Sequence, residues 1–419
     1  MHNSVMLQCL FMVIAGIILS SCHKHDKDEH PTDKTVARTV LVYMVAENTL
    51  SDYATYEGYD IDEMLSASRS LSDNDRLVIY LDNVLNPRIY IITNKNKATT
   101  FAELKPAHSY KEDFNSASAE TLDEILSYTI KHCPADEYGI VFWSHATGWI
   151  PYHGNTNNVS RRSFGVDNGK NISGTGANIG PQMNIEDIAA VLGKYPEMEF
   201  ILFDACFMQC IEVAYELRGC TKYLIGSPAE IPATGAPYEK VIPTMFTNDL
   251  NVGDIAQAYY NGYAYGSFYG SLLSVIDCHK VNSLANITRS IVQAHKQDLL
   301  EADYSGVQNY YKWEYNTSGN ILPDYYDMKG VFQNIIPDYE SNDEYKKWLE
   351  TLDATVVKQL HTNSWYSLFP VTSSNGSIFT LDEKQYSGVT MFVPLDKYKN
   401  SSTFCSDYLN TEWGKKIFN

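Results

Sequence analysis

Cysteine and basic residues are both scarce in this sequence. Only 8 of the 419 residues are cysteine, and no two of them have the Cys-x-x-Cys spacing that is typical of structural zinc sites. Lys and Arg number 32 against 51 Asp and Glu, which gives a formal net charge of −19 at pH 7. This balance argues against a nucleic-acid partner, because phosphates are bound mainly by Lys and Arg.

Long hydrophobic runs and the signature of a serine hydrolase are also missing. The apolar run near the N-terminus, residues 10–19, is about ten residues long and too short to span a bilayer as a helix. No Gly-x-Ser-x-Gly motif stands between a predicted strand and a predicted helix, which disfavours a serine nucleophile. No internal repeat of solenoid period is present.

The first residues are typical of a targeting segment. Residues 1–22 end in Leu19-Ser20-Ser21-Cys22, which resembles a bacterial lipoprotein cleavage site with Cys22 as the acylated residue. The start of the segment has no Lys or Arg, so an ordinary signal peptide cut nearby is the alternative. Residues 23–35 are uniformly polar and are expected to form a tether. We therefore expect a lipid-anchored protein of the bacterial cell envelope, on an undetermined face of the membrane.

The remainder of the chain alternates apolar strand-like runs with helical periodicity. This pattern predicts an α/β fold with a mostly parallel sheet flanked by helices. Six cysteines remain after Cys9 and Cys22 are set aside, and we expect most of them to be free, buried thiols. The predicted strands are 38–46, 76–82, 88–93, 138–143, 199–204, 222–227, 271–276 and 388–393. The predicted helices are 52–69, 119–132, 184–195, 207–218, 253–266, 280–300 and 341–361.

Two predicted strands each end on residues that can carry chemistry. Residues 200–203 are apolar and run into Asp204-Ala205-Cys206, after which helical spacing begins. The run 138–143 ends similarly at Ser144-His145. Because neighbouring parallel strands end at one edge of a sheet, a Cys and a His placed in this way can form a nucleophile and base pair. His153 is a second histidine close to this position.

Taken together, these blocks resemble the clostripain family of cysteine peptidases, which belongs with caspases, gingipains and separases. The resemblance covers residues 36–280 well and the remainder loosely. It implies a caspase-like domain over 36–280 and a C-terminal α/β extension over 281–419. It rests on four further stretches besides the Asp-Ala-Cys motif: residues 40–50, Trp143-Ser144-His145, residues 163–167 and residues 225–230.

The resemblance also assigns roles to individual residues. Cys206 would be the nucleophile and His145 the general acid and base, with the backbone N–H groups of Ala146 and Cys206 as oxyanion donors. The family usually has Gly where this chain has Ala146, whose Cβ would be strained at a positive φ. The implied partners are protein or peptide substrates.

Two acidic residues bear on specificity. In the family, the position of Asp204 helps to select Arg or Lys before the scissile bond. The alternative is that Asp204 caps the following helix. Glu230 is the only acid left in a stretch where the family often carries more, so basic specificity is expected to be weaker. The family also responds to Ca²⁺, although no Asp-x-Asp-x-Asp-Gly loop is present; no other cofactor is expected.

Residues 151–183 lie between the two motifs and are rich in Gly and Asn. Long irregular segments inside a compact domain are usually functional, and we expect this one to be exposed and mobile. The resemblance implies activation by cleavage in this interval. Arg161 and Arg162 are the predicted self-cleavage sites, with Lys170 as the next choice.

A different class of function stays open from the sequence alone. The same fold could serve a non-catalytic surface lipoprotein that binds a peptide or a glycan. Its binding surface would be an aromatic cluster, namely Tyr304, Tyr310, Tyr311, Trp313, Tyr315, Tyr325 and Tyr326. Packing between parts of the chain is the alternative explanation for these aromatics.

The lipoprotein hypothesis gives the first testable prediction. Replacing Cys22→Ala removes the acylation site, so the variant should leave the membrane fraction and appear in the soluble fraction. Membrane flotation of the full-length protein, expressed with its own leader, measures this directly. Association unchanged from wild type would place the anchor elsewhere.

Overall fold

The computed structural model describes residues 35–153, 163–170, 178–265, 267–310, 325–368, 376–396 and 403–419, with the backbone alone at residues 52–54. Residues 32–419 form one compact unit. No helix among the described residues is long and apolar enough to cross a membrane. Cys22, the signal segment 1–22 and most of the tether 23–35 lie outside the described residues, so these expectations stay predictions.

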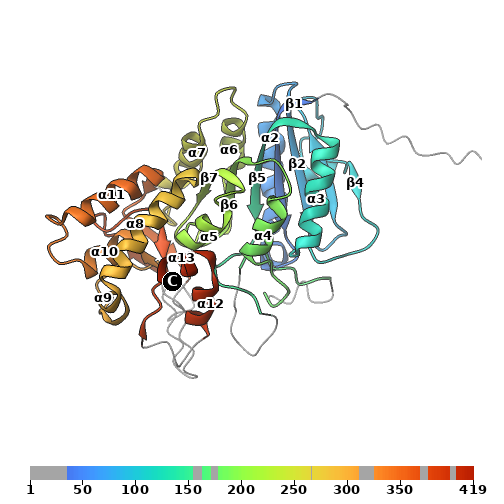
Figure 1. The fold of residues 1–419 in the computed structure, drawn as a ribbon. Helices are drawn as coiled ribbons and strands as arrows, with labels where there is room; N and C mark the ends of the chain where they lie inside the picture. The colour runs from blue at the N-terminus through green and yellow to red at the C-terminus, as the bar shows by residue number, and fades with distance from the viewer. Residues whose placement is uncertain are drawn as a thin grey trace, which may run out of the picture. The chain divides into compact units, whose positions relative to one another are not determined.

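A nine-stranded sheet forms the centre of this unit, with the strand order β10-β8-β7-β6-β5-β1-β2-β3-β4 (Figure 1). The five strands from β7 to β2 in this order are mutually parallel, and the strands outside them are antiparallel to their neighbours. The predicted mostly parallel α/β sheet is therefore confirmed. The nine strands are β1 (Val36–Val45), β2 (Asp75–Asp82), β3 (Arg88–Ile92), β4 (His108–Ser109), β5 (Ala135–Trp143), β6 (Met198–Asp204), β7 (Thr221–Gly226), β8 (Leu272–Asp277) and β10 (Val356–His361).

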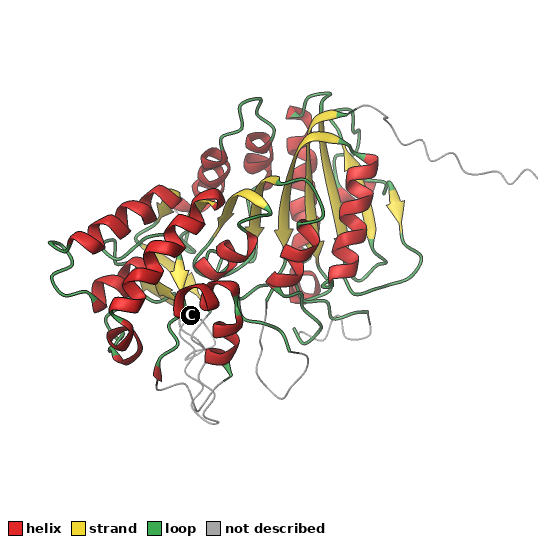
Figure 2. Cartoon of the chain, viewed as in Figure 1, coloured by secondary structure: helices red, strands yellow, loops and turns green. Residues whose placement is uncertain are grey.

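Helices cover both faces of the sheet (Figure 2). One buried core joins the sheet to α3, α4, α5 and α8, and a second core on the opposite face joins it to α2, α6 and α7. The strands are buried on both faces for this reason, which explains their nearly continuous apolar sequences. The helices are α1 (Thr49–Ala54), α2 (Tyr56–Ala67), α3 (Ala119–His132), α4 (Ile185–Leu192), α5 (Ile211–Leu217), α6 (Tyr238–Met245), α7 (Val252–Ala264), α8 (Val281–Ala294), α9 (Lys296–Glu301), α10 (Met328–Ile335), α11 (Asp343–Thr355), α12 (Phe404–Asn410) and α13 (Glu412–Phe418).

The C-terminal residues are built into the same unit. Strand β10 pairs with β8 at the end of the main sheet, and α13 packs against α5 and α8. Two small antiparallel pairs complete this part: β9 (Tyr326–Asp327) with β13 (Thr390–Met391), and β11 (Ser364–Ser367) with β12 (Ser377–Thr380). The helix predicted over 341–361 is present as α11 but is wrong in its last six residues, because residues 356–361 form β10. The apolar residues Val356, Val357 and Leu360 keep helical spacing, and pairing with β8 at the edge of the sheet overrides it.

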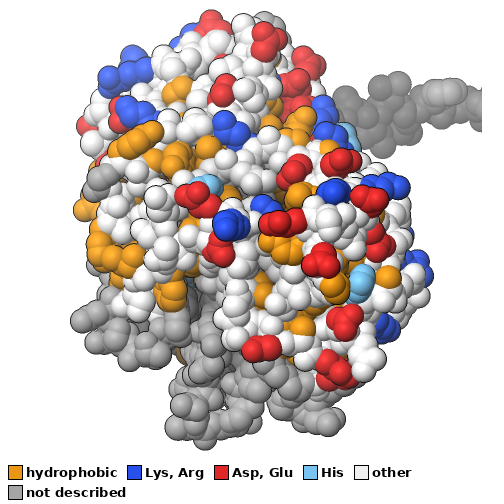
Figure 3. All heavy atoms as spheres, turned by 90° about the vertical axis from the view of Figure 1, so that its left-hand side faces the viewer, with side chains coloured by type: hydrophobic (Ala, Val, Ile, Leu, Met, Phe, Trp, Pro, Cys, Tyr) orange, Lys and Arg blue, Asp and Glu red, His pale blue; other side chains and the backbone are white. Residues whose placement is uncertain are grey.

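The surface on the side of α9, α10 and α11 carries acidic, basic and apolar side chains interspersed (Figure 3). The net negative charge is therefore not gathered into one patch on this face.

Candidate active site

The structure brings Cys206 and His145 to the same edge of the sheet. Strands β5 and β6 are parallel neighbours, and the last residue of each, Trp143 and Asp204, lie opposite one another. His145 and Cys206 each stand two residues beyond these ends. Both side chains line one cavity of about 290 Å³. The residues that share it are Leu50, Trp143, Ser144, Asp204, Glu230, Ile231, Pro232, Ala233, Gly235, Tyr269, Tyr366 and Leu368.

The backbone turns sharply directly after Cys206. Phe207 has a φ of 61°, in the left-handed region that costs a non-glycine residue about 1–3 kcal/mol. Its N–H donates to Ala229 O at 3.0 Å, and its ring packs against Tyr325 with centroids 5.6 Å apart. Strained residues of this kind cluster at functional sites, because the surrounding structure must hold them. Here the strain turns the chain away immediately behind the cysteine.

The predicted helix over 207–218 therefore starts too early. Helix α5 begins only at Ile211, and Cys210 rather than Cys206 occupies its N-cap. A helix N-terminus next to the Cys206 thiol, as expected from the sequence, is not what the structure has. One donor to the sulfur is the backbone N–H of Ile231, 3.4 Å from Sγ, and the thiol can in turn donate to Ile231 O at 4.0 Å. A donor to the charged form of a group stabilises that form, so this contact favours a thiolate.

His145 is positioned from strand β1. Thr49 follows β1 and lies with its Oγ1 2.8 Å from His145 Nε2. Asn178 holds Thr49 in turn, since its Nδ2 donates to Thr49 Oγ1 at 2.9 Å. Residue 178 lies far along the chain and Thr49 carries no titratable group, so sequence reasoning missed both. The signal that could have found Thr49 was its place in the stretch 40–50 that carried the family resemblance.

The backbone conformation after His145 shows that Ala146 is not strained by a positive φ. The described non-glycine residues with positive φ are Thr55, Phe207 and Asp338, and Ala146 is not among them. Positive φ occurs two residues later, at Gly148, where a Cβ would come within 2.8 Å of Phe207 O. Glycine is thus required at 148 rather than at 146.

The bridge between Ala146 and Phe164 does not use the backbone N–H of Ala146. The strand-like bridge between Ala146 and Phe164 is made by their neighbours: Gly165 N donates to His145 O, and Thr147 N donates to Ser163 O. As far as this bridge is concerned, the N–H of Ala146 can still act as the predicted oxyanion donor.

Asp204 lines the cavity and is 3% exposed. Its Oδ2 accepts hydrogen bonds from Ala236 N at 3.0 Å and Tyr238 OH at 2.7 Å, while Oδ1 accepts from Tyr259 OH at 2.7 Å. Burial raises the pKa of Asp204, and these three donors act in the opposite direction. None of them comes from the start of α5, so the alternative role as a helix cap does not apply.

Two further features of the Asp204 region were not foreseen. Tyr238 begins α6 and Tyr259 lies in α7, so neither is close to Asp204 in the sequence. A second buried acid, Asp60 on α2, accepts from Trp143 Nε1 at 2.7 Å, and burial together with the charge of Asp204 raises the pKa of Asp60 well above its usual range. This second acid thus holds Trp143, which lines the cavity together with Asp204.

Glu230 contributes to the cavity wall and ties two segments together. Its Oε2 accepts from Ser367 Oγ and, at 2.7 Å, from Leu368 N. The carboxylate therefore joins the loop after β7 to the end of β11, next to Tyr366.

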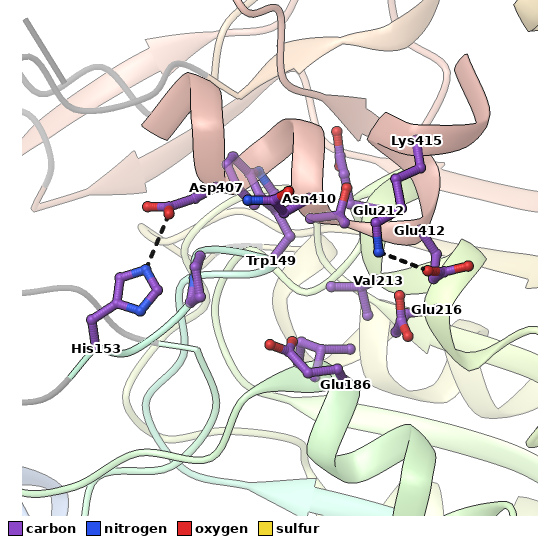
Figure 4. Close-up of a pocket in the computed structure, with 13 residues that line it drawn as sticks. Trp149, His153, Glu186, Glu212, Val213, Glu216, Asp407, Asn410, Glu412 and Lys415 are labelled. Atoms are coloured by element: carbon purple, nitrogen blue, oxygen red, sulfur yellow. Dashed lines mark hydrogen bonds and ion pairs between the residues drawn. The ribbon is translucent and has the colours of Figure 1, made fainter. Parts of the chain in front are cut away.

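His153 belongs to a different cavity, of about 340 Å³, which lies between α4, α5, α12 and α13 (Figure 4). Its Nε2 pairs with Asp407 Oδ1 at 3.2 Å, and Lys415 pairs with Glu412 in the same cavity. His153 does not line the cavity that holds Cys206.

The described cysteines other than Cys206 are buried, and none of the six forms a disulfide, as expected. Burial raises the pKa of Cys133 and of Cys220 to about 11, and it also raises the pKa of Cys210 and Cys278. Cys206 alone of the six is half-buried and opens into a cavity.

The interval 151–183 is only partly as expected. Residues 163–168 are buried, and Phe164 bridges both Ala146 and Met183, so this part is not an exposed, mobile loop. Lys170 is exposed and its Nζ donates to Asn86 Oδ1. Arg161 and Arg162 lie outside the described residues.

The aromatic cluster packs inside the protein where it is described. Tyr304, Tyr310, Tyr325 and Tyr326 are each at most 5% exposed. Tyr311, Trp313 and Tyr315 lie outside the described residues. The described members thus offer no surface to a peptide or a glycan.

A mostly parallel sheet flanked by helices, with a cysteine and a histidine at the ends of adjacent strands, defines a caspase-like α/β protein of the cysteine peptidase class. A model of the Clostripain family matches residues 42–417, and the chain belongs to that family. It is therefore a cysteine peptidase, a hydrolase that acts on protein or peptide substrates.

Solved structures agree with this assignment. The chain is 30% identical to a secreted C11 cysteine protease from Bacteroides thetaiotaomicron, solved with an irreversible peptide inhibitor; the match covers 91% of this chain and 98% of that one, with a TM-score of 0.74. It is 29% identical to an inactive zymogen C11 protease from Parabacteroides distasonis, over 93% and 100% of the two chains, with a TM-score of 0.72. No curated protein matches the chain.

The contrast among the thiols gives the second prediction. Iodoacetamide at neutral pH should modify Cys206 well before the five buried cysteines, because those are shielded and the four with raised pKa values are protonated. Peptide mapping of the native protein by mass spectrometry after short exposure measures the order of labelling. Cys220, whose Sγ donates to Ala189 O, is a matched internal control. Equal labelling of Cys206 and Cys220 would contradict this prediction.

Proposed function

We propose that this protein is a cysteine endopeptidase that works through a dyad of Cys206 and His145. The observation that carries the proposal is that these two side chains line one cavity, together with Asp204, at the ends of neighbouring parallel strands. Membership of the Clostripain family supports the same chemistry.

The proposed reaction runs in two halves. The Cys206 thiolate, stabilised by Ile231 N–H, attacks the carbonyl carbon of the scissile peptide bond, and His145 gives a proton to the leaving amine. The acyl-enzyme forms, and His145 then takes a proton from a water molecule that attacks the thioester. The N–H groups of Ala146 and Cys206 are the proposed donors to the oxyanion in both halves.

Thr49 has a positioning role in this scheme. Its hydroxyl accepts from Asn178, so its own proton is available to His145 Nε2. A hydrogen bond on one ring nitrogen fixes the tautomer and the orientation of an imidazole.

We further propose a preference for Arg or Lys before the scissile bond. Asp204 lines the cavity, and its three hydrogen-bond donors favour a charged carboxylate where little water remains to screen it. The Asp204 carboxylate already accepts three hydrogen bonds, so its attraction for a substrate cation is mainly electrostatic. A preference from charge alone is weaker than one from a bidentate ion pair.

The lipid anchor at Cys22 completes the proposal. The enzyme would act at the bacterial cell envelope, with the polar segment 23–35 between the anchor and the catalytic unit. The membrane fractionation described above tests this part independently of activity.

The third prediction tests the dyad. Cys206→Ala should lower kcat/KM on fluorogenic peptides by at least about a thousandfold, and His145→Ala by nearly as much, because members of one catalytic unit are not additive. Circular dichroism should be unchanged, since Cys206 lies in a half-buried turn and the substitution removes one atom. Cys220→Ala is the matched control and should keep wild-type activity.

Peptides that differ only in the residue before the scissile bond complete this test. Arg and Lys peptides should be cleaved faster than Leu and Glu peptides, and Asp204→Asn should reduce that ratio more than it reduces cleavage of the Leu peptide. Full activity in either dyad variant would refute the mechanism. Equal rates on Arg and Leu peptides would refute only the basic preference.

The fourth prediction concerns self-processing. Wild-type protein incubated alone should be cut after Arg161 or Arg162, with Lys170 as the next site, and Cys206→Ala protein should stay intact. The two fragments should remain together, because the sheet contains strands from both sides of the cut and Gly165 and Thr147 bridge the segments on either side of it. Mass spectrometry of the new N-terminus and gel filtration measure these outcomes.

The control for self-processing is the double variant Arg161→Gln, Arg162→Gln. It should process only at Lys170 or not at all. Wild-type protein that stays intact while it cleaves peptides would exclude activation by processing, and the peptidase mechanism would be unaffected.

A further inference from the structure

Exposed aromatic side chains gather beside the cavity that holds Cys206. Phe268 is 62% exposed and Tyr269 is 41% exposed, and both lie in the segment just before β8. Tyr366 on β11 is half-buried, and its ring centroid lies 4.9 Å from that of Phe268 and 5.7 Å from that of Tyr269. The centroids of Phe268 and Tyr269 are 5.8 Å apart. The three rings thus form one contiguous surface, which we call the aromatic rim.

The aromatic rim is continuous with the Cys206 cavity and extends outward from it. Tyr269 and Tyr366 line the cavity together with Leu368, which is also exposed. Ile378 on β12 is exposed and lies opposite Tyr366 in the β11–β12 pair, and side chains directly opposite in such a pair share one face. Large exposed apolar patches mark binding sites. This patch begins inside the cavity that holds the proposed nucleophile.

Backbone contacts hold the aromatic rim in place although its rings are exposed. Tyr366 N donates to Tyr269 O at 2.8 Å, which joins β11 to the segment before β8. The close approach of these segments requires glycine at Gly270, where φ is 68° and a Cβ would collide with Ser364 O. Glu230 joins the end of β11 to the loop after β7. Because the backbone beneath the rings is fixed, binding a side chain against them requires little further ordering.

The order of the strands along this edge determines which part of a substrate meets the aromatic rim. Strands β7 and β8 lie on one side of β6, and β5 lies on the other. Strand β8 runs antiparallel to β7, so it begins at this edge, with Phe268 and Tyr269 just before it. In the proposed reaction His145, which follows β5, gives a proton to the leaving amine, so the part of the peptide after the scissile bond lies on the β5 side. The acyl part is held by Cys206 after β6 and extends the other way, toward the rim.

We propose that the aromatic rim is the subsite for the second residue before the scissile bond, and that it selects an aromatic or large aliphatic side chain there. The inference rests on the proposed dyad and adds a second specificity position to it. Successive side chains of an extended peptide point to opposite sides. When the residue before the scissile bond is directed to the buried Asp204, the side chain preceding it is directed to the exposed rings.

The chemistry of the aromatic rim sets the order of preference. Burying an apolar side chain against the rings removes apolar surface from water, and contact between two rings adds to this gain. An acidic side chain would instead lose its hydration against ring faces that carry partial negative charge. Phe and Leu should therefore be preferred to Gly at this position, and Gly to Asp.

The test uses peptides with Arg fixed before the scissile bond and Phe, Leu, Gly or Asp at the position before it. For wild type, kcat/KM should be about tenfold higher for Phe and Leu than for Gly, because the apolar side chain is removed from water. Tyr269→Ala and Tyr366→Ala should each lower the Phe-to-Gly ratio by about threefold or more, because each removes a ring from the contact. Tyr269→Phe and Tyr366→Phe keep the rings and should keep the ratio.

The matched control is Tyr265→Ala. Tyr265 is 83% exposed and precedes the aromatic rim in the same segment, but it does not line the cavity that holds Cys206. This variant should keep the wild-type ratio. Equal rates of wild type on the Phe and Gly peptides, or a Phe preference that survives both Tyr269→Ala and Tyr366→Ala, would overturn the subsite. A Phe preference that appears after the scissile bond, and is lost in these two variants, would overturn the orientation.

A binding experiment separates failure of the subsite from failure of the dyad. Peptides that end at the Arg with a free carboxylate carry only the acyl side and have no bond to be cleaved there. In calorimetry with wild type, the Kd of the Phe-Arg peptide should be about tenfold lower than that of the Gly-Arg peptide, and Tyr269→Ala should reduce this difference. Equal Kd values would overturn the subsite whatever the mechanism. This binding preference, together with full cleavage activity in Cys206→Ala, would refute the dyad and leave the subsite standing.

Discussion

The parallel register of four neighbouring strands, β6, β5, β1 and β2, is the constraint on which the rest of the structure depends. Parallel strands that start in register also end together, about 4.8 Å apart, and every residue that follows them emerges at one edge. Trp143 lies opposite Asp204 and next to Met44, and Val45 lies opposite Asp82. The positions of the cysteine, the histidine, the threonine that contacts it and the buried acid Asp82 are all consequences of this one alignment. A shift of any strand by one residue would turn its side chains to the other face.

Asp204 and Glu47 are both buried at this edge, but their carboxylates have different surroundings. Asp204 receives hydrogen bonds from two tyrosine hydroxyls and a backbone amide, so its carboxylate is stabilised by fixed dipoles of the protein. Glu47 has no such donors and faces other carboxylates. The Asp204 carboxylate is thus held by donors, whereas burial and the neighbouring acids raise the pKa of Glu47 to about 8.

Residues whose partners lie in the same local motif could be predicted from the sequence, and residues whose partners come from distant elements could not. The strands were predictable because burial on both faces demands continuous apolar runs, and Cys206 and His145 stood out because each follows such a run. Tyr238, Tyr259 and Thr49 were missed because a hydroxyl gains its role only from tertiary packing. The predicted first residue of α5 was wrong because nothing in the sequence indicates a left-handed backbone conformation at Phe207.

The strain at Phe207 and the position of Cys206 have a common cause. A helix that began directly after β6 would bury residue 206 in its first turn, as Cys210 is buried at the N-cap of the actual α5. The left-handed residue delays the helix, and Ala229 O and the Tyr325 ring hold it in place. Tyr325 also donates to Thr147 O, two residues beyond His145. The same tyrosine therefore supports the turns behind both the cysteine and the histidine, which is why a strained backbone can persist at this point of the fold.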